Sequence, residues 1–291
     1  MAETTPETTL DHSHEQPPST PPETVFADIL CAVGGSKASF EAVSQAAVLA
    51  GRDGQLTLLV VTSVIGSGVT TTTAAISPAR AEHLLTLAEQ ITSKAGVPAT
   101  RLIDPGGPPA KIVLDRAAQH DLLAMGAPPS SRIGALLGGG VAEQAMRSLS
   151  TPLLMARRPP AGTPFPQRIV VSSDGGDDSD RVVELAARLA RANRVGAILV
   201  HAVGVESQSR PHRIAAQARA LERALPEACE VHIEPMGACE AILARAHAAG
   251  ASLIVMGSRS RDGLAALGSV SARVVHEAPC SVLLVPPAAA A

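Results

Sequence analysis

LIVMGSRSRDGLAALGSVSARVVHEAPCSVLLV, residues Leu253 to Val285, is the stretch that decides the fold class of this chain. Its first apolar run stops at Gly257, a polar segment leads to Gly268, and a helical pattern of valines precedes a second apolar run. We interpret this order as strand, glycine-bearing loop, helix and strand. Because unpaired backbone N–H groups and the positive end of a helix dipole coincide at such a loop, the pattern predicts an anion site there.

Length and composition limit the number of domains and exclude some classes of protein. The 291 residues suggest about two domains, and 46% of them are apolar. With three Phe and no Trp or Tyr, the chain has no aromatic platform on which single-stranded nucleic acid could stack. The net charge of -3 without a basic block argues against a sequence-independent binder of the phosphate backbone. We therefore expect no nucleic-acid partner.

Cysteine usage and hydropathy indicate the compartment. Cys31, Cys229, Cys239 and Cys280 lie far apart and form no CxxC pair, so we expect neither a disulfide framework nor a structural zinc site. No apolar run approaches the roughly 20 residues that cross a bilayer, and the N-terminus lacks a signal pattern. The sequence predicts a cytoplasmic protein with no membrane partner.

The N-terminal residues 1–24 are rich in Thr, Pro and Glu, a composition that cannot bury enough apolar surface to fold. We expect a disordered tail. His12 and His14 are flanked by acidic residues, but a metal site needs a scaffold that holds its ligands in place. A solvated tail is the simpler interpretation of this pair.

Apolar runs and helical patterns alternate along the first half of the chain. Strands are expected at residues 27–33, 56–61, 100–103, 121–125 and 153–155, and helices at 36–50, 78–95, 110–118 and 141–149. The strands are apolar without alternation, which is typical of strands covered on both faces. The sequence therefore favours an open parallel sheet wrapped by helices.

The second half repeats the first. Ile169–Asp174 corresponds to Ile29–Gly34, and Gly268-Ser269-Val270 corresponds to Gly139-Gly140-Val141. The interval is longer than a solenoid repeat, so we infer a duplicated domain. A charged and then Pro-rich stretch, RRPPAGTPFP, has the composition of a linker between the copies. The predicted boundaries are 1–24 for the tail, 25–158 for the first domain, 159–164 for the linker and 165–287 for the second domain.

Several of these motifs together resemble the universal stress protein family. They are the strand leading to Asp174-Gly175-Gly176, the run Leu253–Arg259, the helix start Gly268-Ser269-Val270, and Ala278-Pro279-Cys280 before the last strand. The resemblance covers both predicted domains and implies a tandem form, each domain an α/β fold with an open five-stranded parallel sheet and helices on both faces. In the ATP-binding branch of the family, amides and a hydroxyl of the glycine loop hold phosphates and ribose. An acidic residue follows the first strand, and small apolar residues after the second strand line the adenine.

The resemblance implies an adenine nucleotide, ATP with Mg²⁺ or Mn²⁺, mainly in the second domain. The residues that it places there are Ser173, Asp174, Ala202, Met256, Gly257, Arg259, Ser260, Gly268, Ser269, Val270 and Ser271. Ser260 stands where the family has a second glycine, and the loop from it to Gly268 is shorter than the family pattern. Arg259 and Arg261 would add positive charge near a phosphate. The position agrees with the rule that ligands bind at the carboxyl ends of parallel strands.

The first domain keeps the spacing of the nucleotide loop and loses much of its chemistry. The residues implied there are Gly34, Val61, Gly126, Gly139 and Gly140. Pro129 replaces a glycine and has no N–H to donate. Gly140 replaces the hydroxyl residue, and Gly34 stands where the acidic residue is expected. Three lost contacts of about 1 kcal/mol or more each would weaken nucleotide binding by roughly two to three orders of magnitude.

Four of the singled-out residues also have purely structural interpretations. Asp174 can stabilise the N-terminus of the following helix, and Ser269 can be a helix N-cap that needs no ligand. His201 ends an apolar run and is expected to be a packed, hydrogen-bonded residue. Cys280 precedes a buried strand and is expected to be an inert small hydrophobe.

The sequence leaves several functions open. No Walker A, GxSxG, HExxH or EF-hand pattern occurs and no pair of carboxylates suits a general base, so we expect no enzyme beyond incidental slow ATP hydrolysis. One hypothesis is a stress-response regulator that binds an adenine nucleotide. Another is a ligand-free scaffold in which edge strands Leu153–Met155 and Val282–Val285 pair within the chain or in a homodimer. An adenine-nucleotide hydrolase, or an electron-transfer flavoprotein-like protein, are weaker alternatives.

Overall fold

The computed structural model describes residues 24–62, 76–128, 140–148, 150–160, 162–203, 210–225, 229–258 and 268–288. The predicted tail, with His12 and His14, lies outside the described residues apart from Thr24. Within the described residues, no helix is long and apolar enough to cross a membrane.

Ten strands and eight helices alternate along the described chain. The strands are β1 (Asp28–Ala32), β2 (Gln55–Val61), β3 (Ala99–Asp104), β4 (Leu122–Gly126), β5 (Leu153–Ala156), β6 (Arg168–Ser172), β7 (Gly196–Ala202), β8 (Glu230–Glu234), β9 (Leu253–Gly257) and β10 (Ser281–Val285). The helices are α1 (Lys37–Ala50), α2 (Pro78–Ala95), α3 (Pro109–Ala117), α4 (Val141–Arg147), α5 (Asp177–Asn193), α6 (Pro211–Ala224), α7 (Ala238–Ala248) and α8 (Ser269–Glu277). Every element expected in the first half is present.

Local sequence signals account for the helix ends. Ser36 precedes α1, and its hydroxyl accepts the N–H of Ser39 at 3.0 Å, as expected of an N-cap. Pro78 opens α2, and Gly96 ends it at a left-handed φ of 71°, which glycine adopts without a steric cost. Helix α4 ends earlier than predicted, because Ser148 leaves the helical conformation (φ −111°, ψ 31°).

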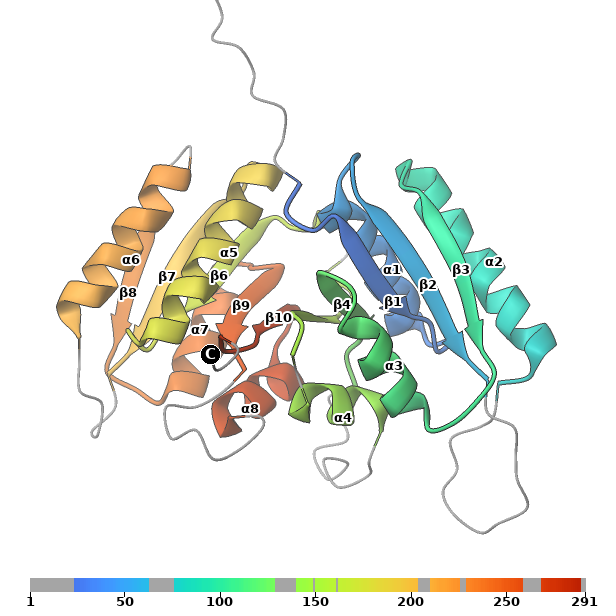
Figure 1. The fold of residues 1–291 in the computed structure, drawn as a ribbon. Helices are drawn as coiled ribbons and strands as arrows, with labels where there is room; N and C mark the ends of the chain where they lie inside the picture. Colours follow the sequence, from blue (N-terminus) through green and yellow to red (C-terminus); the bar gives the residue numbers. More distant parts are fainter. Residues whose placement is uncertain are drawn as a thin grey trace, which may run out of the picture.

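The ten strands form one sheet in the order β3-β2-β1-β4-β5-β10-β9-β6-β7-β8 (Figure 1). Within each half the neighbouring strands are parallel. The two halves meet where β5 and β10 pair antiparallel, with Val282 opposite Met155 and Leu284 opposite Leu153. This pairing confirms the expectation that the last strand of each half seeks a partner within the chain.

The side chains of the strands contribute to two apolar clusters, one on each face of the sheet. One cluster joins α1, α2, α5 and α6 and contains Leu154 and Leu283. The other joins α3, α4, α7 and α8 and contains Leu153 and Leu284. Because both clusters run through β5 and β10, the two halves share their cores. Helices therefore cover both faces, as the sequence predicted (Figure 1).

A buried polar network fastens the joint between the halves. The Ser281 hydroxyl, which is fully buried, lies 2.7 Å from Gln45 Oε1 and accepts the N–H of Arg157 at 3.0 Å. Gln45 Nε2 in turn donates to the Arg157 carbonyl at 2.8 Å. The Arg157 guanidinium donates to the carbonyls of Val275 and His276 at the end of α8. These bonds link α1, the end of β5 and the start of β10.

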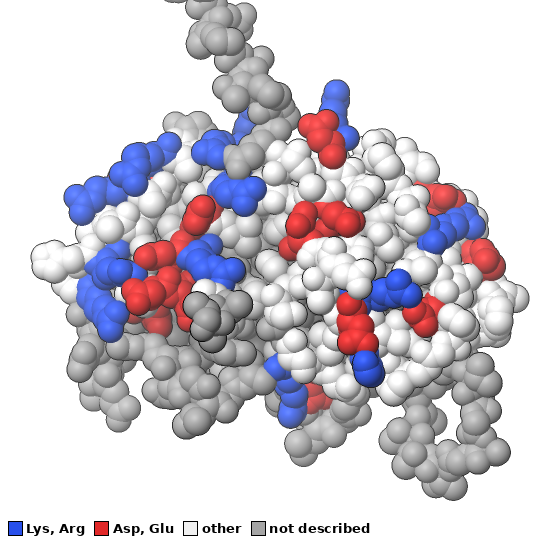
Figure 2. All heavy atoms as spheres, in the orientation of Figure 1, with Lys and Arg blue, Asp and Glu red and all other residues white. Residues whose placement is uncertain are grey.

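The described surface carries both signs of charge. On the face seen in Figure 2, Lys and Arg side chains are interspersed with Asp and Glu side chains. Arg213 of α6, for example, pairs with Asp177 and Asp180 of α5, each at 2.7 Å. The predicted lack of nucleic-acid and membrane partners and the cytoplasmic location remain predictions.

Replacing Ser281 by alanine is expected to lower the free energy of unfolding by about 1–3 kcal/mol, because Gln45 Oε1 and the Arg157 N–H would lose a buried partner. Urea denaturation measures this change. The control is Ser93→Ala on the exposed face of α2, which should shift the free energy by less than about 0.5 kcal/mol. Equal stability of the two variants would show that the network does not hold the joint.

Candidate functional site

The predicted site lies at the carboxyl edge of β6 and β9, which are neighbours in the sheet with Val171 opposite Val255. The chain leaves β6 toward β7 on one side and returns to β9 on the other, which makes this edge a topological switch point. Ser173 and Asp174 follow β6, and Gly257 ends β9. The fold therefore brings together the acidic residue and the first glycine of the predicted site.

Helix α8 begins beside this edge, but its cap differs from the prediction. The N-cap is Gly268, which makes no side-chain cap bond, so the interpretation of Ser269 as the N-cap is wrong. Ser269 is the first helical residue and its side chain is exposed. The N–H groups of Ser269 and Val270 point out of the first turn, where no carbonyl of the helix itself can accept them. They are the amides best placed to face an anion.

Two other groups at this helix start are already engaged. The Gly268 N–H donates to the Ser258 carbonyl at 2.9 Å, so the expectation that this amide is free for a phosphate is wrong. The Ser271 hydroxyl is buried and donates to the Gly257 carbonyl at 2.9 Å. Both bonds tie the end of β9 to α8. They fix the position of the helix start rather than leave groups open.

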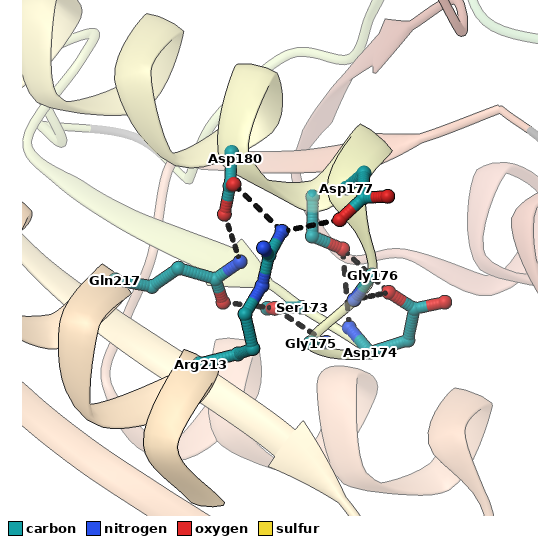
Figure 3. A network of polar contacts seen from close by, with 9 residues as sticks. Ser173, Asp174, Gly175, Gly176, Asp177, Asp180, Arg213 and Gln217 are labelled. Atoms are coloured by element: carbon teal, nitrogen blue, oxygen red, sulfur yellow. Dashed lines mark hydrogen bonds and ion pairs between the residues drawn. The ribbon is translucent and has the colours of Figure 1, made fainter. Parts of the chain in front are cut away.

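Asp174 closes the turn between β6 and α5. Its Oδ1 accepts the N–H of Gly176 and the hydroxyl of Ser179, both at 2.7 Å (Figure 3). The residue is exposed, and its second oxygen takes no part in these two bonds. The structural interpretation of Asp174 therefore accounts for one carboxylate oxygen and leaves the other available.

Ser173 is buried and belongs to a polar network that the sequence did not indicate. Its hydroxyl donates to Gln217 Oε1 at 2.5 Å and accepts the Gly175 N–H at 3.0 Å. Gln217 Nε2 donates to Asp180 Oδ1 at 2.6 Å, and Arg213 lies between the carboxylates of Asp177 and Asp180 (Figure 3). The network locks α6 against the first turn of α5. The only sequence signal was a glutamine among the apolar positions of α6.

The remaining predicted residues fall into three groups. Met256 is buried in the core, while Ala202 and Val61 end the second strand of each half and are partly buried on the α7/α8 and α3/α4 side. Gly34 is exposed, and Gly140 is the N-cap of the seven-residue helix α4. Arg259, Ser260 and Gly139, together with Pro129 and Arg261, lie outside the described residues.

No group of three or more His, Cys, Asp or Glu side chains within the described residues could hold a metal ion. Two cavities lie near the second half of the sheet. One of about 700 Å³ is lined by α5 and α6, and one of about 380 Å³ lies between α6 and β8. Neither is lined by Gly257, Gly268 or Ser269.

Comparison with known proteins decides the family. A profile of the Universal stress protein family matches residues 26–157 and again residues 166–286.

The chain belongs to the universal stress protein family.

Its relatives agree with the tandem architecture. A protein of Thermus aquaticus, described as "Universal stress protein in QAH/OAS sulfhydrylase 3'region", is 34% identical over 136 residues, which is 40% of this chain and 96% of the relative. A universal stress protein structure from Archaeoglobus fulgidus has a TM-score of 0.71 at 19% identity and covers 91% of this chain and 97% of its own. A putative universal stress protein from Pseudomonas aeruginosa has a TM-score of 0.62 at 16% identity over 90% of this chain and 94% of its own. The two structures establish the fold alone.

The two domains of this universal stress protein differ at the glycine that ends their fourth strand. A Cβ on Gly126 would lie 2.6 Å from the Ala38 carbonyl carbon and 2.7 Å from the Ser39 nitrogen, so the start of α1 fills this space. Among the described residues, a Cβ on Gly257 would meet nothing closer than Val182 Cγ2 at 3.9 Å. Packing explains why Gly126 must be glycine. It does not explain Gly257, beside which the described part of the chain leaves room.

All four cysteines of this universal stress protein are buried free thiols. Burial raises the pKa of each thiol, that of Cys280 to about 12, so the thiols stay protonated near neutral pH. Since the thiolate is the reactive form, Cys280 is an inert core residue, as the sequence indicated.

Gly126→Ala is expected to destabilise the protein by about 1–3 kcal/mol, because the added methyl group would overlap the backbone of α1. Gly257→Ala is the matched variant in the second domain and should change the free energy of unfolding by less than about 0.5 kcal/mol. Chemical denaturation of both variants measures the difference. Equal costs would contradict the assignment of open space to Gly257.

Proposed function

We propose that this universal stress protein is a stress-response regulator, not an enzyme, that binds ATP in its second domain. The observation that carries the proposal is the start of α8 at the carboxyl end of β9. There the N–H groups of Ser269 and Val270 lack acceptors within their own helix. The positive end of the helix dipole lies at the same place, and the two effects together favour a phosphate.

The neighbouring groups suit the rest of a nucleotide. The free oxygen of Asp174 can accept a hydrogen bond from a ribose hydroxyl, and Ala202 offers a small apolar surface to an adenine ring. The space beside Gly257 lets a phosphate approach the backbone. The first turn of α5 carries Asp177, Asp178 and Asp180, which repel phosphate, although Arg213 offsets two of them. Mg²⁺ or Mn²⁺ would reach the site with the phosphates, which supply most of its ligands in nucleotide sites.

The first domain is the poorer candidate within the same proposal. The space beside its glycine is filled by α1, and its helix α4 has only seven residues. Gly34 supplies no carboxylate at the position that corresponds to Asp174. The nucleotide is therefore assigned to one domain of the two.

The test is calorimetry of the full chain with Mg-ATP. Ser269→Pro removes the N–H at the first helical position, where proline is tolerated, and should weaken ATP binding about tenfold to a hundredfold through loss of a charge-assisted hydrogen bond. Ser269→Ala removes only the hydroxyl and separates its contribution from that of the amide. Val141→Pro makes the matching change at the first position of α4 and should leave binding unchanged. No heat from folded wild-type protein at millimolar ATP would overturn the proposal.

A second candidate function is a scaffold that needs no ligand, and the antiparallel pairing of β5 with β10 favours it. Both strands are completely buried, and the network around Ser281 joins them to α1. A rigid pair of domains would present the same surface whether or not a nucleotide is bound.

Cleavage between the domains tests the scaffold directly. A protease site introduced between Gly162 and Thr163 should allow the linker to be cut, after which the two halves are expected to co-elute in gel filtration without nucleotide, because the shared core is intact. Leu283→Asp, which places a carboxylate in the buried joint, should release separate halves after the same cut. Halves that separate in the unsubstituted protein would rule the scaffold out.

A further inference from the structure

The cavity of about 380 Å³ between α6 and β8 has mostly apolar walls. Ile214 and Ala218 of α6 form one side, and Val231 and Ile233 of the edge strand form the other. His201, the penultimate residue of β7, lines its inner end. A volume of this size with few polar groups is typical of sites for small molecules.

His201 brings one unsatisfied hydrogen-bonding atom to this cavity. The side chain is 1% exposed, and Nδ1 lies 2.9 Å from the Ser173 carbonyl. Because a carbonyl only accepts, Nδ1 carries the proton, and Nε2 of the neutral ring is an acceptor. Among the described residues Nε2 is buried without a partner. Buried polar atoms are rarely left unpaired, so this nitrogen calls for a donor.

The outer wall of the cavity exposes apolar side chains to solvent. Val231 is 38% exposed and Ile233 is 60% exposed, and both are among the large apolar residues that the described surface leaves open. The strand register places Val231 opposite Leu199 and Ile233 opposite His201, so both point to the same face of the sheet as the histidine. Nε2 itself is closed to water. A ligand would reach it by displacing a wall side chain, and the exposed Ile233 is the one least held by packing.

The corresponding place in the first domain is lined by different side chains. The strand registers make Val60 the counterpart of His201 and Arg101 the counterpart of Val231. Val60 is fully buried and apolar. Arg101 reaches across to α2, where it pairs with Glu89 and, at 3.5 Å, with Glu82. The second domain has the apolar Val231 where the first has this ion-paired arginine, and the buried His201 where the first has Val60.

This cavity is separate from the proposed nucleotide site. His201 follows the alternation of Leu199, whose side chain packs with α5 and α6, whereas Ala202 packs on the face of α7 and α8. The cavity is lined by none of Asp174, Gly257 or Ser269. A ligand here needs no phosphate and meets no helix N-terminus of α8.

We propose that the second domain binds, in this cavity, a small apolar molecule that carries a hydroxyl or N–H donor for His201 Nε2. The apolar walls bury the body of the molecule, and the imidazole selects for a donor at its inner end. A ligand that offers only acceptors at that end leaves two acceptors facing each other and is rejected. Indole has the required chemistry, and 1-methylindole is the same ring without the donor.

The absence of Trp and Tyr from the chain makes the measurement direct, because the fluorescence of indole is read without a protein background. Fluorescence titration of the full chain should show saturable binding of indole and about tenfold weaker binding of 1-methylindole, the effect of one hydrogen bond to a buried acceptor. His201→Val, which copies Val60, should make the two affinities equal. Val231→Arg places an arginine where the first domain has Arg101. Glu222 lines the same cavity and corresponds to Glu89, so the new arginine has an acidic partner, and binding of both ligands should be abolished.

The matched control is His232→Val, which makes the same substitution on β8 at a position that faces the other side of the sheet. It should bind both ligands as the wild type does, and circular dichroism checks that each variant is folded. The proposal is overturned if folded wild-type protein does not bind indole at millimolar concentration. It is equally overturned if wild type binds the two ligands alike, or if His201→Val retains the preference for indole.

Discussion

The antiparallel pairing of β5 with β10 is the interaction on which the rest of the structure depends. Each half alone would end in an apolar strand with an open edge, and pairing satisfies both rows of backbone groups at once. It also makes the two apolar clusters continuous from one half to the other. Because this one ladder is antiparallel, the strands of one half run opposite to those of the other half where the two meet.

Duplication has let the two halves share a backbone and diverge in chemistry. At the end of the fourth strand, Gly126 is packed by α1 and Gly257 is not. At the edge strand, Arg101 is held by acidic residues of α2 while Val231 lines a cavity. At both places the backbone fold of the two halves is the same, and the difference lies in which side chains or backbone atoms fill the space beside the strand.

Much of the candidate site could be predicted because parallel strands end at one edge. Asp174 and Gly257 come together for that reason, and the pattern of apolar strand and glycine sufficed to place them. The occupied Gly268 amide could not be foreseen, since its partner, the Ser258 carbonyl, comes beside it only in the folded chain. The network of Gln217 and Arg213 was missed because its members come from different elements and meet only when α6 docks on α5.

The sequence by itself determined the strands, the helices, the duplication and the two strands that join the halves. These follow from periodic burial of apolar residues and from the glycine, proline and serine signals at helix ends, which are local properties of the chain. The tertiary structure alone decided which polar groups remain available to bind a ligand. Whether an amide, a carboxylate or an imidazole nitrogen has a hydrogen-bond partner depends on the three-dimensional position of its neighbours. His201 shows both outcomes in one ring, because Nδ1 is paired while Nε2 is buried without a partner among the described residues.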